Sequence, residues 1–179
     1  TTVWTYNAAG QILTARDALN NLTTYAYYTD TTADHTVGDL QSVTNAEGHR
    51  TSKSWDPVQA VRTSETDPNG LVTQWQYDAF QRPLHEVRPD GTATDLARTY
   101  CGSSCVTPAA LHLATSIERG AGGIAIGSST IAYDLMDREV SRQAEQPGGT
   151  VMRVTAYSDR GLVSRQSVVG GPSREPGAS

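Results

Sequence analysis

The sequence predicts an all-β protein, an antiparallel meander of β-hairpins with little or no helix. Three observations support this prediction: a recurring phrase, turn sequences at regular intervals, and alternating side chains between the turns. The phrase is clearest at Tyr77–Leu84 and Tyr133–Val140, which both begin Tyr-Asp and carry Arg at the sixth position. Such a repeat chain is quasi-one-dimensional, because each unit is buried mainly against its neighbours.

Looser copies of the phrase begin at Tyr6, Trp55 and Tyr157. The expected units start near residues 6, 27, 55, 77, 100, 133 and 157, so the whole chain, 1–179, forms a single array. Residues that recur once per unit are expected to be structural: Tyr6, Gly10, Tyr27, Gly48, Trp55, Asp56, Gly70, Tyr77, Asp78, Gly91, Tyr100, Tyr133, Asp134, Tyr157 and Gly161.

A second turn sequence lies within each unit. Asp67-Pro68-Asn69-Gly70 and Asn45-Ala46-Glu47-Gly48 each have an aromatic residue seven positions after the glycine. Proline presets φ at about −65°, Asp or Asn bonds the turn backbone, and glycine tolerates positive φ. Each unit is therefore expected to contain two strands and two turns.

The segments between turns alternate as strands do. In Leu71–Tyr77, residues 71, 73, 75 and 77 share one face, and Val72, Gln74 and Gln76 face the other way. Leu, Ile, Val and Phe make up 31 residues, about 17% of the chain, which suits a sheet with one polar face. The segment 108–114 also fits a short helix, with a strand over 111–119 as the alternative.

Charge and hydropathy argue against two classes of function. The net charge of −5 and a pI near 5.3, with both signs interspersed, argue against nucleic-acid binding. No apolar run is long enough to span a membrane, and no signal peptide is evident. Both ends are expected to be cut from a longer array, because capping units are missing and open sheet edges favour aggregation.

The first of two insertions, at about residues 28–37, is polar, and we expect a solvated loop there. Asp30, Asp34 and His35 are metal-ligand types, but their spacing implies no geometry, so no metal site is predicted.

The second insertion, at about residues 101–110, contains the only two cysteines, Cys101 and Cys105. A local disulfide is favoured, which implies an oxidising destination. Two free structural thiols and a redox or metal site are the alternatives.

The sequence predicts no enzyme, no cofactor and no catalytic residue. Ser103 and Ser104 lack the Gly-x-Ser-x-Gly frame, and the glycines at 120–123 precede a strand rather than a helix. The recurring Tyr and Trp side chains are of the type that stacks on sugars, but cross-strand packing is the favoured interpretation.

The repeated phrases resemble the YD repeats of the Rhs family, over about residues 3–169. Tyr77-Asp78 and Tyr133-Asp134 carry the Tyr-Asp position, and degenerate copies stand at Tyr6-Asn7, Trp55-Asp56 and Tyr157-Ser158. The glycines of the pattern are matched by Gly10, Gly48, Gly70, Gly91 and Gly161.

The resemblance implies a shell. In bacterial Rhs polymorphic toxins and the C component of ABC-type toxin complexes, the hairpins form one sheet that spirals into a hollow shell, or in teneurins a barrel. The shell encloses a C-terminal toxin domain, and the bacterial members are secreted or delivered, for example by type VI secretion in bacterial competition. The implied partners are the rest of the shell and its enclosed toxin.

One sequence feature and one alternative function remain. Asp67-Pro68-Asn69-Gly70-Leu71 has the letters of the family's self-cleavage site, but it lies in an ordinary repeat turn without a preceding Tyr-rich run, so no cleavage is assigned. The alternative is an extracellular carbohydrate- or protein-binding module for adhesion or recognition, using the aromatics or insertion residues such as Tyr28 and His35.

Overall fold

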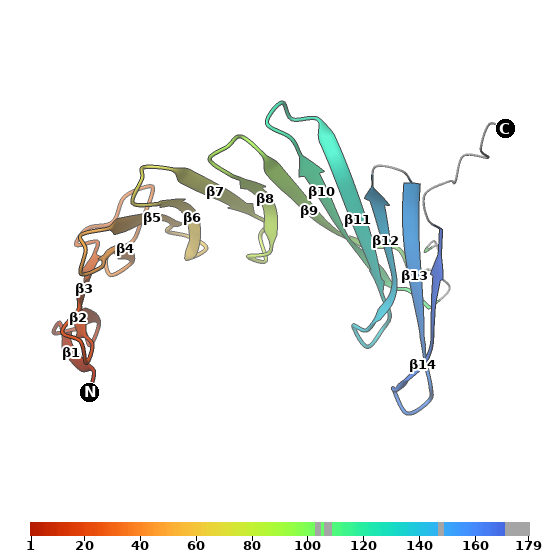
Figure 1. Cartoon of the computed structure of the whole chain (residues 1–179), viewed down its shortest axis with the longest axis horizontal. Helices are drawn as coiled ribbons and strands as arrows, with labels where there is room; N and C mark the ends of the chain where they lie inside the picture. The colour runs from red at the N-terminus through yellow and green to blue at the C-terminus, as the bar shows by residue number, and fades with distance from the viewer. Residues whose placement is uncertain (103–104, 106–108, 147–148, 171–179) are drawn as a thin grey trace. The chain divides into compact units, whose positions relative to one another are not determined.

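The computed structural model describes residues 1–102, 105, 109–146 and 149–170. All fourteen described elements are β-strands (Figure 1). They are β1 (Val3–Tyr6), β2 (Ile12–Arg16), β3 (Leu22–Tyr27), β4 (Leu40–Thr44), β5 (Arg50–Asp56), β6 (Val61–Thr66), β7 (Val72–Tyr77), β8 (Pro83–Val87), β9 (Ala93–Tyr100), β10 (His112–Arg119), β11 (Ala125–Tyr133), β12 (Glu139–Gln146), β13 (Gly149–Tyr157) and β14 (Val163–Val169).

The strands are arranged as an antiparallel meander in chain order, which confirms the predicted fold class. The chain divides into two compact units, Thr1–Pro89 and Asp90–Ser179. Unit 1 contains β1–β8 and unit 2 contains β9–β14. Within each unit every strand pairs with the next, because the connections are too short for a crossover to a parallel neighbour.

The alternation predicted for residues 72–77 is confirmed. In β7 the side chains of Thr73, Trp75 and Tyr77 are half-buried, whereas those on the other face are exposed. Leu71 is exposed, because it lies outside the strand, in the preceding turn. The strand alternative after the second insertion is confirmed as well, because β10 occupies His112–Arg119. The described part of the 108–114 segment forms no helix; residue 108 lies outside the described residues.

The hydrophobic core is thin. Among the described residues the buried apolar side chains are small, namely Ala93, Ala110, Ala132 and Val140. The last three form a cluster in unit 2, with Leu113 and Tyr157 packed against it. No described helix is both long and apolar enough to cross a membrane. Because so little apolar surface is buried, the turns and side-chain bonds between hairpins must contribute much of the specificity of the fold.

Candidate functional site

One backbone frame recurs in the five-residue turns. The first residue donates its N–H to the carbonyl of the fifth, and the fourth donates its N–H to the carbonyl of the first. Turns of this kind cover residues 7–11, 17–21, 45–49, 67–71, 78–82, 120–124, 134–138 and 158–162. The Tyr-Asp half and the Asp-Pro-Asn-Gly half of the repeat therefore end in the same turn.

The first residue of most of these turns also uses its side chain. The Oδ1 atom accepts hydrogen bonds from the N–H groups of the third and fifth residues, as Asp78 does from Phe80 and Arg82 at 2.8 and 3.0 Å. The same pair of bonds is made by Asn7, Asp17, Asn45, Asp67 and Asp134. An Asx side chain in this position imitates a backbone turn, which is why the repeat carries Asp or Asn there.

The fourth residue of every one of these turns has positive φ. The values run from 58° at Asp137 to 84° at Gly48. Glycine suits this conformation at Gly10, Gly48, Gly70 and Gly161, but Asn20, Gln81 and Asp137 adopt it in their own turns. Gly91 also has positive φ.

The turns differ in the strand that precedes them. We call the turns at 7–11, 78–82, 134–138 and 158–162 the aromatic turns, because a Tyr immediately precedes each one. The turn at 56–60 follows Trp55 and is counted with them, although its bonding differs: Ala60 donates its N–H to the Asp56 carbonyl. At each of these aromatic residues the strand register shifts by a β-bulge. The plain turns at 17–21, 45–49 and 67–71 follow regular pairing. A bulge changes the direction of the side chain beside it, and two of these aromatics, Trp55 and Tyr157, bond to the neighbouring hairpin.

Three aromatic side chains bond to the preceding hairpin. The Tyr27 hydroxyl donates to the Ile12 carbonyl at 2.9 Å, the Trp55 Nε1 donates to the Leu40 carbonyl at 2.9 Å, and the Tyr157 hydroxyl donates to the Glu139 carbonyl at 2.9 Å. Each acceptor pairs, across the preceding hairpin, with the aromatic residue of that hairpin. The pairs are Ile12 with Tyr6, Leu40 with Tyr27, and Glu139 with Tyr133. The recurring aromatics thus connect successive hairpins.

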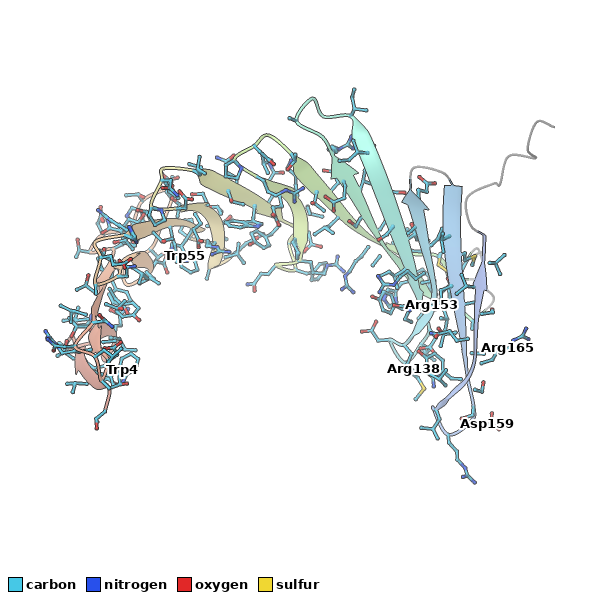
Figure 2. The ribbon with its side chains drawn as sticks, in the orientation of Figure 1. Trp4, Trp55, Arg138, Arg153, Asp159 and Arg165 are labelled. Carbon is cyan, nitrogen blue, oxygen red and sulfur yellow. A yellow bond between two sulfur atoms is a disulfide. The ribbon has the colours of Figure 1, made fainter. Side chains whose placement is uncertain are left out.

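The turn at 134–138 shows the most complete form of this connection. Asp134 binds the Arg138 guanidinium at 2.7 and 2.8 Å, and that guanidinium lies over the Tyr157 ring, 4.4 Å from its centroid. Arg138 is labelled in Figure 2. Burial raises the pKa of the Asp134 carboxyl, but hydrogen bonds from Arg138 and Met136 outweigh it, so the pKa lies below its usual value.

An ion-pair cluster lies next to this turn in unit 2. Glu139 accepts from Arg142 at 2.7 Å and from Arg153 at 2.6 Å, and those two arginines directly face each other on β12 and β13 (Arg153 is labelled in Figure 2). The hydrogen bond from Arg142 lowers the pKa of Glu139 despite partial burial, and Arg153 lowers it further. A matching cluster in unit 1 joins Glu65 to Lys53 and Arg62.

The first insertion is a loop, as the sequence predicts: it contains no strand, and residues 29–34 and 37 are exposed. The loop is inserted into a turn with the same backbone frame. The backbone N–H of Tyr28 donates to the Asp39 carbonyl, and the N–H of Gly38 donates to the Tyr28 carbonyl, both at 2.9 Å. His35 is only 12% exposed and stacks on Tyr28 with ring centroids 3.5 Å apart. The sequence does not indicate the contact between His35 and Tyr28, because that contact is set by tertiary packing.

The inserted loop is anchored to β5. Trp55 donates its backbone N–H to the Asp34 carbonyl at 2.8 Å, and the Tyr28 hydroxyl donates to the Lys53 carbonyl at 2.8 Å. Tyr28 and His35 therefore hold the loop against β5 and against each other. His35 pairs with Asp30 at 3.2 Å, but no group of three metal-ligand residues occurs among the described residues.

A hollow of about 650 Å³ lies between this loop and the first hairpin. Its walls include Leu13, Tyr27 and Val37. The amides at its rim are already bonded, because Asn7 donates to Gln11 and Gln11 donates to the Gly38 carbonyl, each at 2.7 Å. The hollow therefore combines apolar walls with two amide side chains whose positions are fixed by these bonds.

The second insertion carries a disulfide between Cys101 and Cys105, whose Cα atoms lie 5.1 Å apart. Cys101 directly follows Tyr100, so it occupies the position that an Asp or Asn occupies in a regular aromatic turn. The backbone N–H of Cys101 donates to the Leu111 carbonyl at 3.0 Å. Cys105 packs against the small apolar cluster of unit 2. The disulfide thus fastens the connection in which the Asx residue is replaced. Ser103 and Ser104 lie outside the described residues.

Sequence reasoning placed the recurring aromatics and glycines but missed Arg138, Glu139 and the equivalence of the two turn types. A signal for the turns was present: Asn7 and Gly10, Asn45 and Gly48, and Asp67 and Gly70 all stand three residues apart. The turns at 78–82 and 134–138 lack this signal, because Gln81 and Asp137 occupy the position with positive φ and neither residue type usually indicates positive φ in a sequence.

Comparisons with known proteins agree with this architecture. The family model described as RHS Repeat matches residues 62–93. Two crystal structures share the fold: TcdB2-TccC3 without its hypervariable C-terminal region, at 15% identity and a TM-score of 0.65, and TcdB2-TccC3-Cdc42, at 18% identity and a TM-score of 0.60. Each match covers 94% of this chain and 9% of the other chain. No curated protein sequence matches significantly.

The matched repeat spans the plain turn at 67–71, Tyr77 and the aromatic turn at 78–82. The same frame recurs in both units, and the fold agrees with that of the two TcdB2-TccC3 structures. Residues 62–93 therefore match the RHS repeat, and the chain as a whole has the fold of the two TcdB2-TccC3 structures.

Proposed function

We propose that this chain is a structural wall segment of an Rhs/YD-repeat shell, which encloses a C-terminal toxin or effector domain for delivery to target cells. Its partners are then the remaining repeats of the same shell and the enclosed domain. The protein is secreted or delivered outside the producing cell, with type VI secretion and competition between bacteria as the proposed setting.

One observation carries the proposal: 94% of the chain shares its fold with 9% of a much larger TcdB2-TccC3 chain. A wall segment needs stiffness between neighbouring hairpins, and the aromatic bonds and the Arg138 contact provide it. The disulfide at Cys101 and Cys105 is consistent with an oxidising destination.

A non-catalytic role fits the polar side chains of the recurring positions. The carboxylates with lowered pKa, such as Asp78, Asp134 and Glu139, are held by backbone N–H groups or arginines of the fold itself. Asp67, which stands in the cleavage-like sequence, accepts from Asn69 and Leu71 as an ordinary turn residue. We infer that these groups stabilise the wall and do not react with a substrate.

The experiment is to purify the native gene product that contains this segment and measure its intact mass before and after mild proteolysis. The proposal expects a polypeptide far above 19.2 kDa and a separate, protease-protected fragment that co-purifies with the repeats. A mature product near 19.2 kDa would contradict it, because fourteen strands are too few to enclose a domain.

A further inference from the structure

The connection between β9 and β10 lacks the side-chain cap that most of the regular turns have. In those turns the first residue is Asp or Asn, whose Oδ1 atom accepts two backbone N–H groups, as Asp78 and Asp134 do. Cys101 stands in the equivalent position and has no oxygen in its side chain. The backbone N–H groups of Cys101 and Gly102 both donate to the Leu111 carbonyl, at 3.0 and 3.1 Å. In place of the cap, the side chain of Cys101 forms the disulfide.

The disulfide connects this loop to the apolar cluster of unit 2. Cys105 packs against the cluster, which consists of Ala110, Ala132 on β11 and Val140 on β12. Tyr157 on β13 packs against the same cluster. Because the disulfide ties Cys105 to the start of the connection, it keeps this side chain at the point where β11, β12 and β13 meet.

The disulfide lies in a partly exposed part of unit 2. Cys101 and Cys105 are both partly exposed, and the neighbouring Tyr100 is 74% exposed. A disulfide exchanges only when a thiolate can reach one of its sulfur atoms, and exposed disulfides are the ones that external thiols reduce most readily. The two cysteines lie four positions apart. A bond across so short a loop stabilises the fold only modestly, so its loss loosens unit 2 without unfolding it.

We propose that Cys101 and Cys105 form a thiol–disulfide exchange site, at which a dithiol reductant loosens the strand junction of unit 2. One thiolate of the reductant attacks a sulfur of the bond, which forms a mixed disulfide and releases the other cysteine as a thiolate that takes up a proton. The second thiol of the reductant then breaks the mixed disulfide. The reductant leaves as a disulfide, and two electrons and two protons remain on the cysteines, so that Cys105 is held by packing alone.

Dithiol proteins keep thiols reduced in the cytosol, so the exchange takes place where the chain meets a reducing cytosol. In the setting proposed above, that compartment belongs to the target cell. The exchange itself needs no enclosed domain, and the experiments below therefore succeed or fail independently of the intact-mass measurement that tests the shell.

Hydrogen exchange of the whole chain, read by mass spectrometry, tests the effect of reduction. The chain is compared before and after treatment with dithiothreitol, a small dithiol, at the same pH and temperature. Amides of β10, β11 and β12 should exchange about tenfold faster after reduction, because the crosslink no longer restricts the open state. Unit 1 contains no cysteine and is the internal control. Equal exchange in unit 2 before and after reduction, or an equal acceleration in both units, overturns the proposal.

The kinetics of reduction test whether the folded chain reacts. Reduction adds two hydrogen atoms to the chain, which an intact mass measures. At urea concentrations below the unfolding transition, the rate should be proportional to the dithiothreitol concentration and nearly independent of urea, because a reductant can reach the bond without unfolding. A rate that rises steeply with urea overturns the proposal, since the bond then reacts only after unit 2 opens. Two free thiols that persist after air oxidation overturn it as well.

Cys101→Ser separates the covalent bond from the packing of Cys105. The variant keeps the Cys105 side chain beside the cluster and cannot form the disulfide. Measured in dithiothreitol, its hydrogen exchange should match that of the reduced natural chain, with an unchanged circular dichroism spectrum. A variant that exchanges as slowly as the oxidised natural chain overturns the proposal, because the bond then contributes nothing to the junction. If the variant does not fold, the comparison of the oxidised and reduced natural chain still decides.

Discussion

The aromatic turn at 134–138 and the plain turn at 17–21 have the same backbone frame but different contacts. The polar side chains of the plain turn bond locally, with Asn21 donating to Asp17 and Arg16 donating to Asn20. The aromatic turn contacts hairpins on both sides, because Asp137 pairs with His112 and Arg138 lies over Tyr157. The backbone frame of the turn is therefore a local feature. The contacts between hairpins depend on further side chains of the turn, such as Asp137 and Arg138.

The largest effect is expected for Asp134→Ala. The substitution removes two backbone caps and the partner of Arg138, in a side chain that is 10% exposed. Charged hydrogen bonds of this kind suggest a loss of about 2–3 kcal/mol in the free energy of unfolding, measured by urea denaturation. Asp17→Ala is the matched control in an exposed turn and should cost much less; equal losses would refute the distinction between the two turns.

The next effect concerns the fourth position of the turn. Gly70 has a φ of +81° and open space around the missing Cβ, so Gly70→Ala adds only backbone strain, about 1–2 kcal/mol. Ala60, the last residue of the turn at 56–60 and not its fourth, already has positive φ, at 53°, so Ala60→Gly should not lower the midpoint of thermal denaturation. A stability loss for Ala60→Gly that matches that of Gly70→Ala would show that positive φ is not what selects glycine.

Tyr157→Phe tests the aromatic bond alone. The variant keeps the ring under Arg138 and removes the donor to the Glu139 carbonyl, so a loss of about 1 kcal/mol is expected. Tyr100→Phe is the control, because Tyr100 is among the exposed side chains. If chemical denaturation gives the same small change for both, the hydroxyl bond does not hold the hairpins together.

The smallest effect at neutral pH is expected for Glu139→Gln, about 1 kcal/mol or less, because both arginine partners are partly exposed. The pKa of Glu139 is lowered from 4.5 by Arg142 and Arg153, so the folded state binds fewer protons than the unfolded state. This contribution is complete above about pH 4.5 and is lost as the pH falls through the folded-state pKa. Unfolding midpoints measured between pH 7 and pH 3 should fall less steeply for Glu139→Gln than for the natural chain.

The strand pattern and the fold class were accessible from the sequence. Thr73, Trp75 and Tyr77 alternate with polar residues, and a period of two is sufficient to assign a half-buried strand. The turns were found through Gly48 and Gly70, whose positive φ is marked by the residue type itself. Gln81 and Asp137 were not recognised as their equivalents, because positive φ at such residues is imposed by the surrounding hydrogen bonds.

The insertions show the limit of the sequence more clearly. Their positions follow from the interrupted period, and the polar composition of the first one correctly indicates that most of it is exposed. The composition does not indicate that His35 stacks on Tyr28, or that Asp34 accepts a backbone hydrogen bond from Trp55, 21 positions away. Composition reports hydration preferences, whereas burial depends on which surfaces meet.

The sequence by itself determined the antiparallel meander, the Asx turns and the once-per-unit aromatics, because each depends on local φ/ψ preferences and a period of two. Only the tertiary structure decided that Tyr27, Trp55 and Tyr157 bond the preceding hairpin and that Glu139 gathers Arg142 and Arg153. Those contacts depend on strand register and on the bulge beside each aromatic, and a register is fixed only when strands pair.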